Sequence, residues 1–198
     1  MKEIVIATQN KGKVAEIALA LSKLPIKVLS LSDFGPIPEA VEDGTSFLEN
    51  ALLKARHYSQ YTGKACLADD SGLEVDALQG APGIYSARFA GETASDDDNN
   101  RKLLAELLDV ETKGRTARFR CVLAFVDHDE TVLTTDGVCS GMITTEAQGL
   151  GGFGYDCLFY VPELKKTMAE LSKTEKNAIS HRGRALENMA IQLGGYLK

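Results

Sequence analysis

The sequence has few cysteines, no long apolar run and no excess of positive charge. None of the cysteines belongs to a CxxC pair, and their spacing indicates neither a zinc site nor a disulfide framework. They are Cys66, Cys121, Cys139 and Cys157. We therefore expect free thiols in a reducing, cytoplasmic compartment. No apolar stretch is long enough for a signal peptide or a membrane span, so we expect no membrane partner.

The excess of acidic over basic residues argues against one large class of partners. The net charge is -6 and the isoelectric point is near 5.2, which argues against a protein that binds the backbone of DNA or RNA. We therefore expect no nucleic-acid partner. A small phosphorylated ligand stays compatible with this charge, because its site needs only a few local cations and a metal ion.

The composition is that of an ordinary globular protein. Hydrophobic residues make up 44% of the 198 residues and charged residues 25%, so the chain can bury a core without a partner. A chain of this length predicts one domain over residues 1–198, with room for two lobes.

Strand-like and helix-like patterns alternate along the chain. Apolar residues recur with a period of two in the expected strands and on one stripe in the expected helices. The strands are expected over 3–7, 26–31, 65–68, 115–126, 131–143 and 158–161, and the helices over 13–23, 46–61, 95–108 and in a tail that ends before residue 194. A capping box at Ser172 and Glu175 starts that tail, and a polar turn over 127–130 joins the two longest strands. This order predicts an α/β fold in which helices pack on a mixed sheet.

The first of four polar clusters lies between the first strand and the first helix. It reads Thr8-Gln9-Asn10-Lys11-Gly12-Lys13. A loop at that place can direct backbone N–H groups and the Lys13 ammonium at a phosphate, with help from the helix dipole. It lacks the GxxxxGK[ST] pattern of a P-loop, so an ordinary polar turn before a capped helix is an equally good interpretation.

The second cluster, Asp69-Asp70-Ser71, directly follows an apolar strand. Two adjacent carboxylates repel each other unless a cation or hydrogen bonds offset their charge. A magnesium ion would offset it, since Mg2+ takes one or two carboxylates together with water and substrate phosphates. A solvated turn is the competing interpretation.

More acidic residues lie upstream, around the start of the second expected helix. In that helix Glu49 and Asn50 fit an exposed face. Taken singly, each of the four acidic residues upstream is better explained as a surface residue than as a ligand. They are Glu39, Glu42, Asp43 and Glu49.

The third cluster is rich in glycine and aromatic residues and reads Gly151-Gly152-Phe153-Gly154-Tyr155-Asp156. Glycine lets the backbone approach a ligand closely, and an aromatic ring can stack on a base. A tight loop whose aromatic rings join the core is the alternative interpretation.

The fourth cluster consists of Lys176 and the segment Ser180-His181-Arg182. Ser180 could cap the last helix, which would leave His181 and Arg182 in its first turn, where the helix dipole disfavours cations. A residue that breaks a local rule is often there for a ligand. The guanidinium of Arg182 would suit a keto oxygen or a phosphate.

Together these clusters resemble the inosine triphosphate pyrophosphatase family, also known as the dITP/XTP diphosphatases. The resemblance runs nearly from end to end. Six segments in the same order carry it, namely Thr8-Gln9-Asn10-Lys11-Gly12-Lys13, Ser46-Phe47-Leu48-Glu49-Asn50-Ala51, Ala68-Asp69-Asp70-Ser71-Gly72-Leu73, Gly80-Ala81-Pro82-Gly83-Ile84-Tyr85-Ser86-Ala87-Arg88, Gly151-Gly152-Phe153-Gly154-Tyr155-Asp156 and Ser180-His181-Arg182.

The resemblance implies both a fold and an activity. The fold is a two-lobed α/β homodimer with an elongated mixed β-sheet flanked by helices. The activity is Mg2+-dependent hydrolysis of a purine nucleoside triphosphate, dITP, ITP or XTP, to the monophosphate and pyrophosphate. This reaction removes deaminated purines from the nucleotide pool.

The resemblance also implies roles for single residues. Asp70 would be the proton acceptor and a metal ligand, and Ser71 would contact the substrate. Glu42 matches the second metal carboxylate better than Glu39 does, with Asp69 close by. The other substrate-binding residues would be Thr8, Gln9, Asn10, Lys11, Gly12 and Lys13 around the triphosphate, and Phe153, Gly154, Tyr155, Asp156, Lys176, His181 and Arg182 around the nucleoside and its base.

Two positions depart from the pattern of that family. Gln9 stands where a smaller residue is usual, and Cys157 stands where a proline is expected. The first change would alter how closely the loop approaches a phosphate, and the second would loosen a turn. Neither residue is a proposed catalytic group.

Two other functions compete with this interpretation. A non-catalytic nucleotide-binding protein could dispense with carboxylates, so the set Glu42, Asp69 and Asp70 argues against it. A pyrophosphatase for modified pyrimidine nucleotides would need a different base pocket, which the segment Ser180-His181-Arg182 disfavours.

Overall fold

A computed structural model describes residues 1–128 and 132–198 of the chain. The side chain of Lys11 is also outside the description, so the expected phosphate contact of Lys11 has no structural counterpart to report. Two of the four residues of the turn expected over 127–130, and the first residue of the strand expected over 131–143, also lie outside the described residues. No helix within the described ranges has the length and apolar character that crossing a membrane requires.

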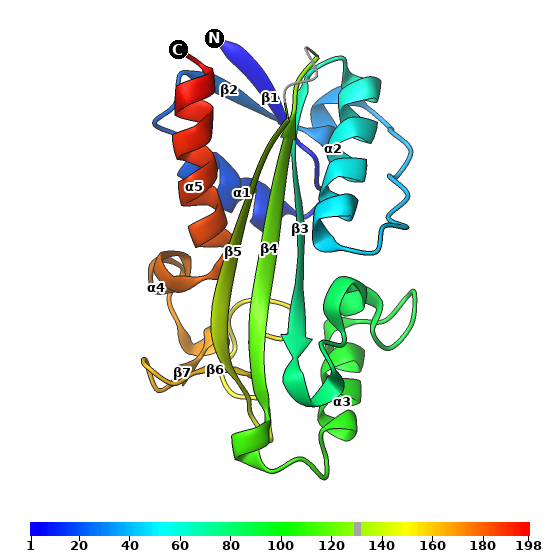
Figure 1. Ribbon diagram of the computed structural model, residues 1–198, viewed down its shortest axis with the longest axis vertical. Helices are drawn as coiled ribbons and strands as arrows, with labels where there is room; N and C mark the ends of the chain where they lie inside the picture. Colours follow the sequence, from blue (N-terminus) through cyan, green and yellow to red (C-terminus); the bar gives the residue numbers. More distant parts are fainter. Residues whose placement is uncertain (129–131) are drawn as a thin grey trace. The chain divides into compact units, whose positions relative to one another are not determined.

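Within these described ranges, seven strands form one mixed sheet in the order β2-β1-β3-β4-β5-β6-β7, and Figure 1 labels each of them. β1 pairs in parallel with both β2 and β3, whereas β6 pairs antiparallel with β5 and β7. The strands are β1 (Lys2–Ile6), β2 (Ile26–Ser30), β3 (Ala65–Val75), β4 (Thr116–Val126), β5 (Val132–Ile143), β6 (Phe159–Val161) and β7 (Lys166–Thr167). The mixed sheet with its helices confirms the predicted α/β class.

Five α-helices occur in the described part of the chain. They are α1 (Lys11–Ala20), α2 (Phe47–Thr62), α3 (Asp96–Glu106), α4 (Lys173–Ile179) and α5 (His181–Tyr196). Serine hydroxyls at Ser46, Ser95 and Ser172 accept hydrogen bonds from backbone N–H groups in the first turns of α2, α3 and α4. The caps predicted at Ser95 and Ser172 are therefore confirmed, and each satisfies one N–H that a helix start leaves without an intrahelical partner.

The chain divides into two compact units. The first comprises Met1–Asp70, Cys121–Gly137 and Arg182–Lys198, and the second comprises Ser71–Arg120 and Val138–His181. Each of the strands β3, β4 and β5 therefore contributes residues to both units. None of the four cysteines forms a disulfide bond within the described part of the chain.

The first unit has a layer of helix on each face of its strands. Ile6 and Leu67 are fully buried and pack with Ile17 of α1 and Met189 of α5. The neighbouring position Cys66 points to the other face, since its thiol lies 3.7 Å from a hydroxyl of α2. Figure 1 shows α5 and α2 on opposite sides of these strands. Each large apolar side chain buried in this way stabilises the fold by roughly 1.5–3 kcal/mol.

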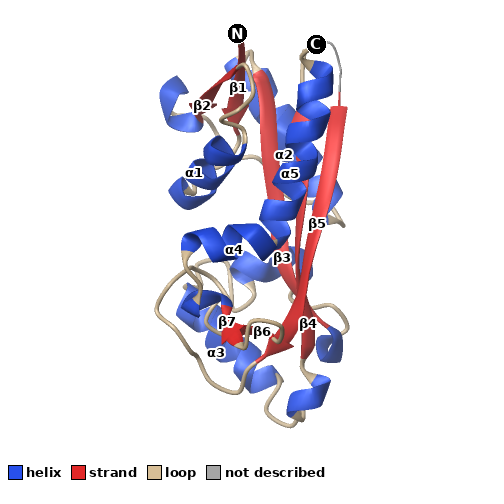
Figure 2. Ribbon diagram, turned by 90° about the vertical axis from the view of Figure 1, so that its left-hand side faces the viewer, coloured by secondary structure: helices blue, strands red, loops and turns tan. Residues whose placement is uncertain are grey.

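The second unit has a separate core. Leu73 of β3 is fully buried and packs with Leu103 of α3, with Leu107 at the end of that helix and with Phe159 of β6. Figure 2 shows α3, α4 and the short strands β6 and β7 that belong to this unit. Tyr155, which the sequence left open as a ligand contact, is part of the same core.

Several element ends differ from the sequence predictions, among them both ends of α1, and two of the differences have a clear physical reason. The strand predicted over 65–68 continues to Val75, because the two aspartates are paired with cations on the two faces of the sheet and do not need to lie in a solvated turn. The tail helix passes through the glycines at 194 and 195 and ends at Tyr196. The hydroxyl of Tyr196 donates to Asp127 and accepts from Lys2, and these bonds hold the last turn in place.

Candidate active site

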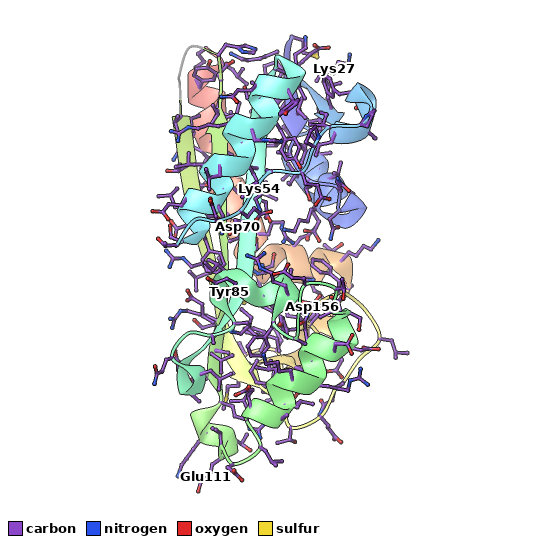
Figure 3. All side chains as sticks on the ribbon, turned by 90° about the vertical axis from the view of Figure 1, so that its right-hand side faces the viewer. Lys27, Lys54, Asp70, Tyr85, Glu111 and Asp156 are labelled. Carbon is purple, nitrogen blue, oxygen red and sulfur yellow. The ribbon has the colours of Figure 1, made fainter. Side chains whose placement is uncertain are left out.

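A carboxylate pair shares one lysine in the first unit. The Lys54 ammonium lies 2.9 Å from a carboxylate oxygen of Glu42 and 2.9 Å from Oδ1 of Asp70. Lys54 projects from α2, Asp70 lies in β3, and Glu42 lies in the loop that precedes α2. Figure 3 shows Lys54 and Asp70 side by side. The structure thus brings together two of the three carboxylates that the sequence indicated as metal ligands.

Asp70 keeps one oxygen without a partner. Its Oδ2 is buried and has no hydrogen-bond partner within the part of the chain that the structure describes. Burial raises the pKa of Asp70, and the nearby charge of Glu42 adds to this effect, although the Lys54 ammonium opposes it. A buried acceptor without a donor costs free energy in a folded protein. An oxygen in this state is typical of a site that is built to bind something else.

Local hydrogen bonds fix the loop that carries Glu42. The backbone N–H of Gly44 donates to the buried side chain of Asn50 at 2.9 Å, and the Glu49 carboxylate accepts from the backbone N–H and the hydroxyl of Thr45. A Cβ on Gly44 would lie only 2.7 Å from Oδ1 of Asn50. Asn50 is 1% exposed, so the predicted exposed face at Glu49 and Asn50 is wrong for Asn50. Its amide instead holds the Glu42 loop against α2.

Asp69 points to the opposite face of the sheet from Asp70. Its carboxylate pairs with Lys13 of α1 and, at 2.9 Å, with Arg182 of α5, and it accepts a hydrogen bond from the Cys121 thiol at 3.2 Å. Burial alone would raise the pKa of Asp69, but the charges of Arg182 and Lys13 hold it well below its ordinary value. Asp69 is therefore a buried anion that organises two cations.

The buried guanidinium of Arg182 pairs with two carboxylates. Its guanidinium donates to Asp69 and, at 2.9 Å, to Glu16 of α1. These two anions raise the pKa of Arg182 against the effect of burial. They also explain how the second residue of α5 tolerates a cation next to the positive end of the helix dipole. The local conflict seen in the sequence is thus resolved by ion pairs inside the first unit.

The carboxylates can be tested as ligands for a metal ion. No three His, Cys, Asp or Glu side chains gather in a metal-binding arrangement anywhere in residues 1–128 and 132–198, and Asp69 does not join Glu42 and Asp70. Two carboxylates nevertheless match what Mg2+ takes from a protein when water and phosphate complete its shell. The partnerless oxygen of Asp70 also fits this demand. The donor set of Glu42 and Asp70 therefore fits a divalent cation that binds together with a phosphorylated ligand.

The predicted phosphate loop forms the N-terminus of α1. Asn10 is the N-cap and accepts from the backbone N–H of Lys13 at 3.1 Å, and the Thr8 hydroxyl accepts from the N–H of Asn10. Gln9 departs from the pattern of the resembled family, and its side-chain Nε2 donates a hydrogen bond to Oε1 of Glu39 at 3.5 Å. Glu39 therefore interacts with this loop, whereas Glu42 interacts with Lys54. The residues of the loop lie at a helix start, where anions are favoured.

A cavity of about 630 Å³ opens beside this loop within the first unit. Its walls come from the ends of β1 and β2, from α1, from the segment before α2 and from α2 itself. They are lined by Thr8, Gln9, Val14, Ala15, Ser30, Leu31, Ser32, Gly35, Pro36, Ile37 and Tyr58. Thr8 and Gln9 of the predicted substrate-binding set thus border a hollow of ligand size.

The glycine-rich loop of the second unit is built around Asp156. Its carboxylate accepts from the backbone N–H of Phe153 at 2.9 Å and pairs with the ammonium of Lys176 on α4. Gly152 and Gly154 have φ values of +77° and +61°, which residues with a side chain rarely adopt. The structure thus brings Phe153, Asp156 and Lys176 together as the sequence resemblance implied.

The two aromatic residues of this loop differ in their surroundings. Tyr155 is buried, and its hydroxyl donates to the backbone oxygen of Ser86 at 2.8 Å. Phe153 is 40% exposed, and the Lys176 ammonium lies 4.6 Å from the centre of its ring. Only Phe153 therefore offers an accessible ring face, and Tyr155 fits the alternative that it joins the core.

His181 and Ser71 complete the predicted set in the second unit. The buried His181 ring stacks on Phe119 with the centroids 4.9 Å apart and an angle of 17° between the planes. Ser71 follows Asp70 directly in β3 and is half-buried. His181 thus has an aromatic neighbour that fixes the plane of its ring.

Lys54 is the main residue that the sequence reasoning missed. It lies on the same face of α2 as the buried residues Phe47, Asn50 and Ala51, which precede it by seven, four and three residues. A lysine on such a stripe breaks the helical pattern of apolar residues, and that irregularity is the signal that could have found it. Asn50 breaks the same stripe and was missed for the same reason.

Comparisons with known proteins agree over nearly the whole chain. A sequence model of the Ham1 family matches residues 4–192. A dITP/XTP pyrophosphatase of Desulforamulus reducens is 54% identical over 185 residues, which cover 93% of this chain and 92% of that protein. A dITP/XTP pyrophosphatase of Geobacter sulfurreducens is 53% identical over 194 residues and 98% of each chain. The solved structure of a HAM1 protein from Coxiella burnetii matches with a TM-score of 0.91, 45% identity and 98% coverage of both chains.

Proposed function

This chain belongs to the Ham1 family, and from that premise we propose that it hydrolyses dITP, ITP and XTP to the monophosphate and pyrophosphate. One observation in the structure carries the proposal. A buried oxygen of Asp70 has no hydrogen-bond partner in the described chain, beside a lysine that Asp70 shares with Glu42. A non-catalytic binding protein would have no use for a carboxylate in this costly state. The function places the protein in the removal of deaminated purines from the nucleotide pool.

Asp70 acts as the proton acceptor in the proposed reaction. A water molecule attacks the α-phosphorus, and a bond forms between these two atoms. The bond from the α-phosphorus to the oxygen that bridges to the β-phosphorus breaks, and pyrophosphate leaves with its electron pair. The proton of the water goes to Asp70. Burial raises the pKa of this carboxyl group, which makes its carboxylate a stronger base.

Glu42 and Asp70 are the proposed ligands of a magnesium ion. The bound ion would offset negative charge on the phosphate oxygens. The Gly44 and Asn50 hydrogen bond holds Glu42 at the start of α2, so both carboxylates are placed before the substrate arrives. Asp69 is not proposed as a ligand of this ion, because its carboxylate pairs with Lys13 and Arg182.

The loop Thr8-Gln9-Asn10-Lys11-Gly12-Lys13 is proposed to bind the triphosphate. Its place at the N-terminus of α1 and the positive charge of Lys13 favour an anion. The pairing of Lys13 with Asp69 fixes where that charge lies. Catalysis would then come mainly from positioning and electrostatics.

Recognition of the base is assigned to residues at the glycine-rich loop and the start of α5. The exposed ring of Phe153 would stack on a purine. Fixed donors among Lys176, His181 and Arg182 would select a 6-keto group over the 6-amino group of adenine, because the amino group would leave a donor unpaired. Ser71 is proposed as a further substrate contact beside Asp70.

The oligomeric state of the enzyme and its cellular compartment are also proposed. The resemblance to the inosine triphosphate pyrophosphatase family favours a homodimer, which light scattering of the purified protein would test. Four free thiols favour a reducing, cytoplasmic compartment.

A panel of nucleotides tests the proposed function. Pyrophosphate release with Mg2+ should be measured from ITP, XTP, dITP, ATP, GTP and dUTP. We expect the first three to be cleaved with kcat/KM values at least about tenfold higher than the others. Preferential cleavage of dUTP would favour a pyrimidine enzyme, and binding without any pyrophosphate release would favour a non-catalytic nucleotide-binding protein.

A further inference from the structure

The Lys54 ammonium forms ion pairs with the two carboxylates that would hold the metal ion. Its ammonium lies at 2.9 Å from both Glu42 and Asp70, and its side chain is 12% exposed. The three charged groups carry a net charge of -1. Because one ammonium interacts with both acids, it keeps them close together without any metal ion.

A lysine at this place and a divalent cation would bind the same two carboxylates. The ammonium takes Oδ1 of Asp70 and one oxygen of Glu42. A divalent ion on the same carboxylates would lie next to the ammonium, and two positive charges in a buried site repel each other strongly. Lysine can leave, since its charge sits on a flexible four-carbon chain.

From this geometry we propose that Lys54 is a resident counter-ion that must leave Glu42 and Asp70 before a divalent cation binds there. The inference rests on the proposed function for the identity of the site. Lys54 thereby preserves the arrangement of the two carboxylates in the metal-free protein, and it weakens metal binding when no nucleotide is present. Lys54 is a positioning residue in this state.

Removal of the charge provides the first test. In Lys54→Met the side chain keeps its apolar stem and nearly its volume. The probe is Mn2+ alone, titrated into nucleotide-free protein and followed by electron paramagnetic resonance. Lys64→Met is the matched control, since Lys64 pairs at the surface with Glu3 and its loss changes the net charge equally. We expect Lys54→Met to bind Mn2+ about tenfold more tightly than the wild type, and Lys64→Met to bind it like the wild type.

The opposite results overturn the proposal. Equal or weaker binding of Mn2+ by Lys54→Met would show that the lysine supports the metal site or is indifferent to it. Absence of Mn2+ binding in both proteins would also overturn it. Because no nucleotide is present, these results are independent of whether the wild type releases pyrophosphate, so failure of the proposed function is detected separately.

A measurement on the wild type keeps the test valid if Lys54→Met does not fold. The NH3+ resonance of Lys54 can be followed by NMR of 15N-labelled protein, with Lys54→Arg for its assignment. Added Mg2+ should shift this resonance or remove it by faster exchange with water, to the same extent that Mg2+ saturates the protein. An unchanged resonance at saturation would overturn the proposal.

Discussion

Asp69 and Asp70 are neighbours in the sequence, yet their carboxylates point to opposite faces of the sheet in the first unit. Asp69 pairs with cations on α1 and α5, and Asp70 pairs with Lys54 on α2. The alternation of side chains along a strand produces this arrangement. It separates two tasks, because Asp69 holds cations in place while Asp70 keeps an oxygen available for chemistry.

Replacement of Asp69 should mainly reduce stability. Asp69→Asn leaves the charges of Lys13 and Arg182 without their shared anion, and loss of one partner from a buried ion pair costs about 3–5 kcal/mol. Urea unfolding measures this loss in the free energy of unfolding. Glu3→Gln is the control, since Glu3 pairs with Lys27 and Lys64 at the surface and should matter far less. Similar losses in both variants would contradict the role given to Asp69.

The same carboxylate predicts how stability depends on pH. The pKa of Asp69 in the folded protein lies well below 3.8, whereas the unfolded chain has an ordinary value. Its contribution is therefore complete above the unfolded pKa and is lost as the pH falls through the folded pKa. Between about pH 4 and pH 2 the wild type should lose stability more steeply than Asp69→Asn. Parallel curves from urea unfolding at each pH would exclude this explanation.

The aromatic residues of the glycine-rich loop should respond differently to substitution. Phe153→Ala removes an exposed ring and should raise the KM for ITP by about 5- to 100-fold, the range expected for one stacking contact, with an unchanged melting temperature. Tyr155→Phe removes a buried hydrogen bond to Ser86 and should cost about 1 kcal/mol of stability, with an unchanged KM. Steady-state kinetics and urea unfolding of both variants would reveal a reversed pattern, which the assignment does not allow.

Much of the fold could be predicted from the sequence because its strands and helices have clear periods. The long alternation in β4 and the cap at Ser95 are local signals, and both elements are where they were expected. The ends of β3 and α5 were wrong because distant partners decide them. Cations from other elements allow β3 to continue through its two aspartates, and Asp127 anchors Tyr196 at the end of α5.

Only some residues of the candidate site could be predicted from the sequence. The residues of the phosphate loop and Asp70 stand in short motifs, so the resemblance to a family could indicate them. Lys54 and Asn50 lie on a helix that otherwise has an ordinary amphipathic pattern, and their importance arises only from the Glu42 loop folding over α2. The opposite directions of the Asp69 and Asp70 side chains could not be predicted, because the predicted strand ended before these two residues.

The central claim is that Asp70 performs the chemistry, and turnover of Asp70→Asn tests it most directly. Pyrophosphate release from ITP with Mg2+ should be compared with Asp76→Asn, which alters an exposed aspartate just beyond the same strand. We expect kcat to fall by about 100-fold or more in Asp70→Asn, with a melting temperature that is not lowered, and to stay unchanged in Asp76→Asn. A folded Asp70→Asn enzyme that keeps the turnover of the wild type would contradict the account.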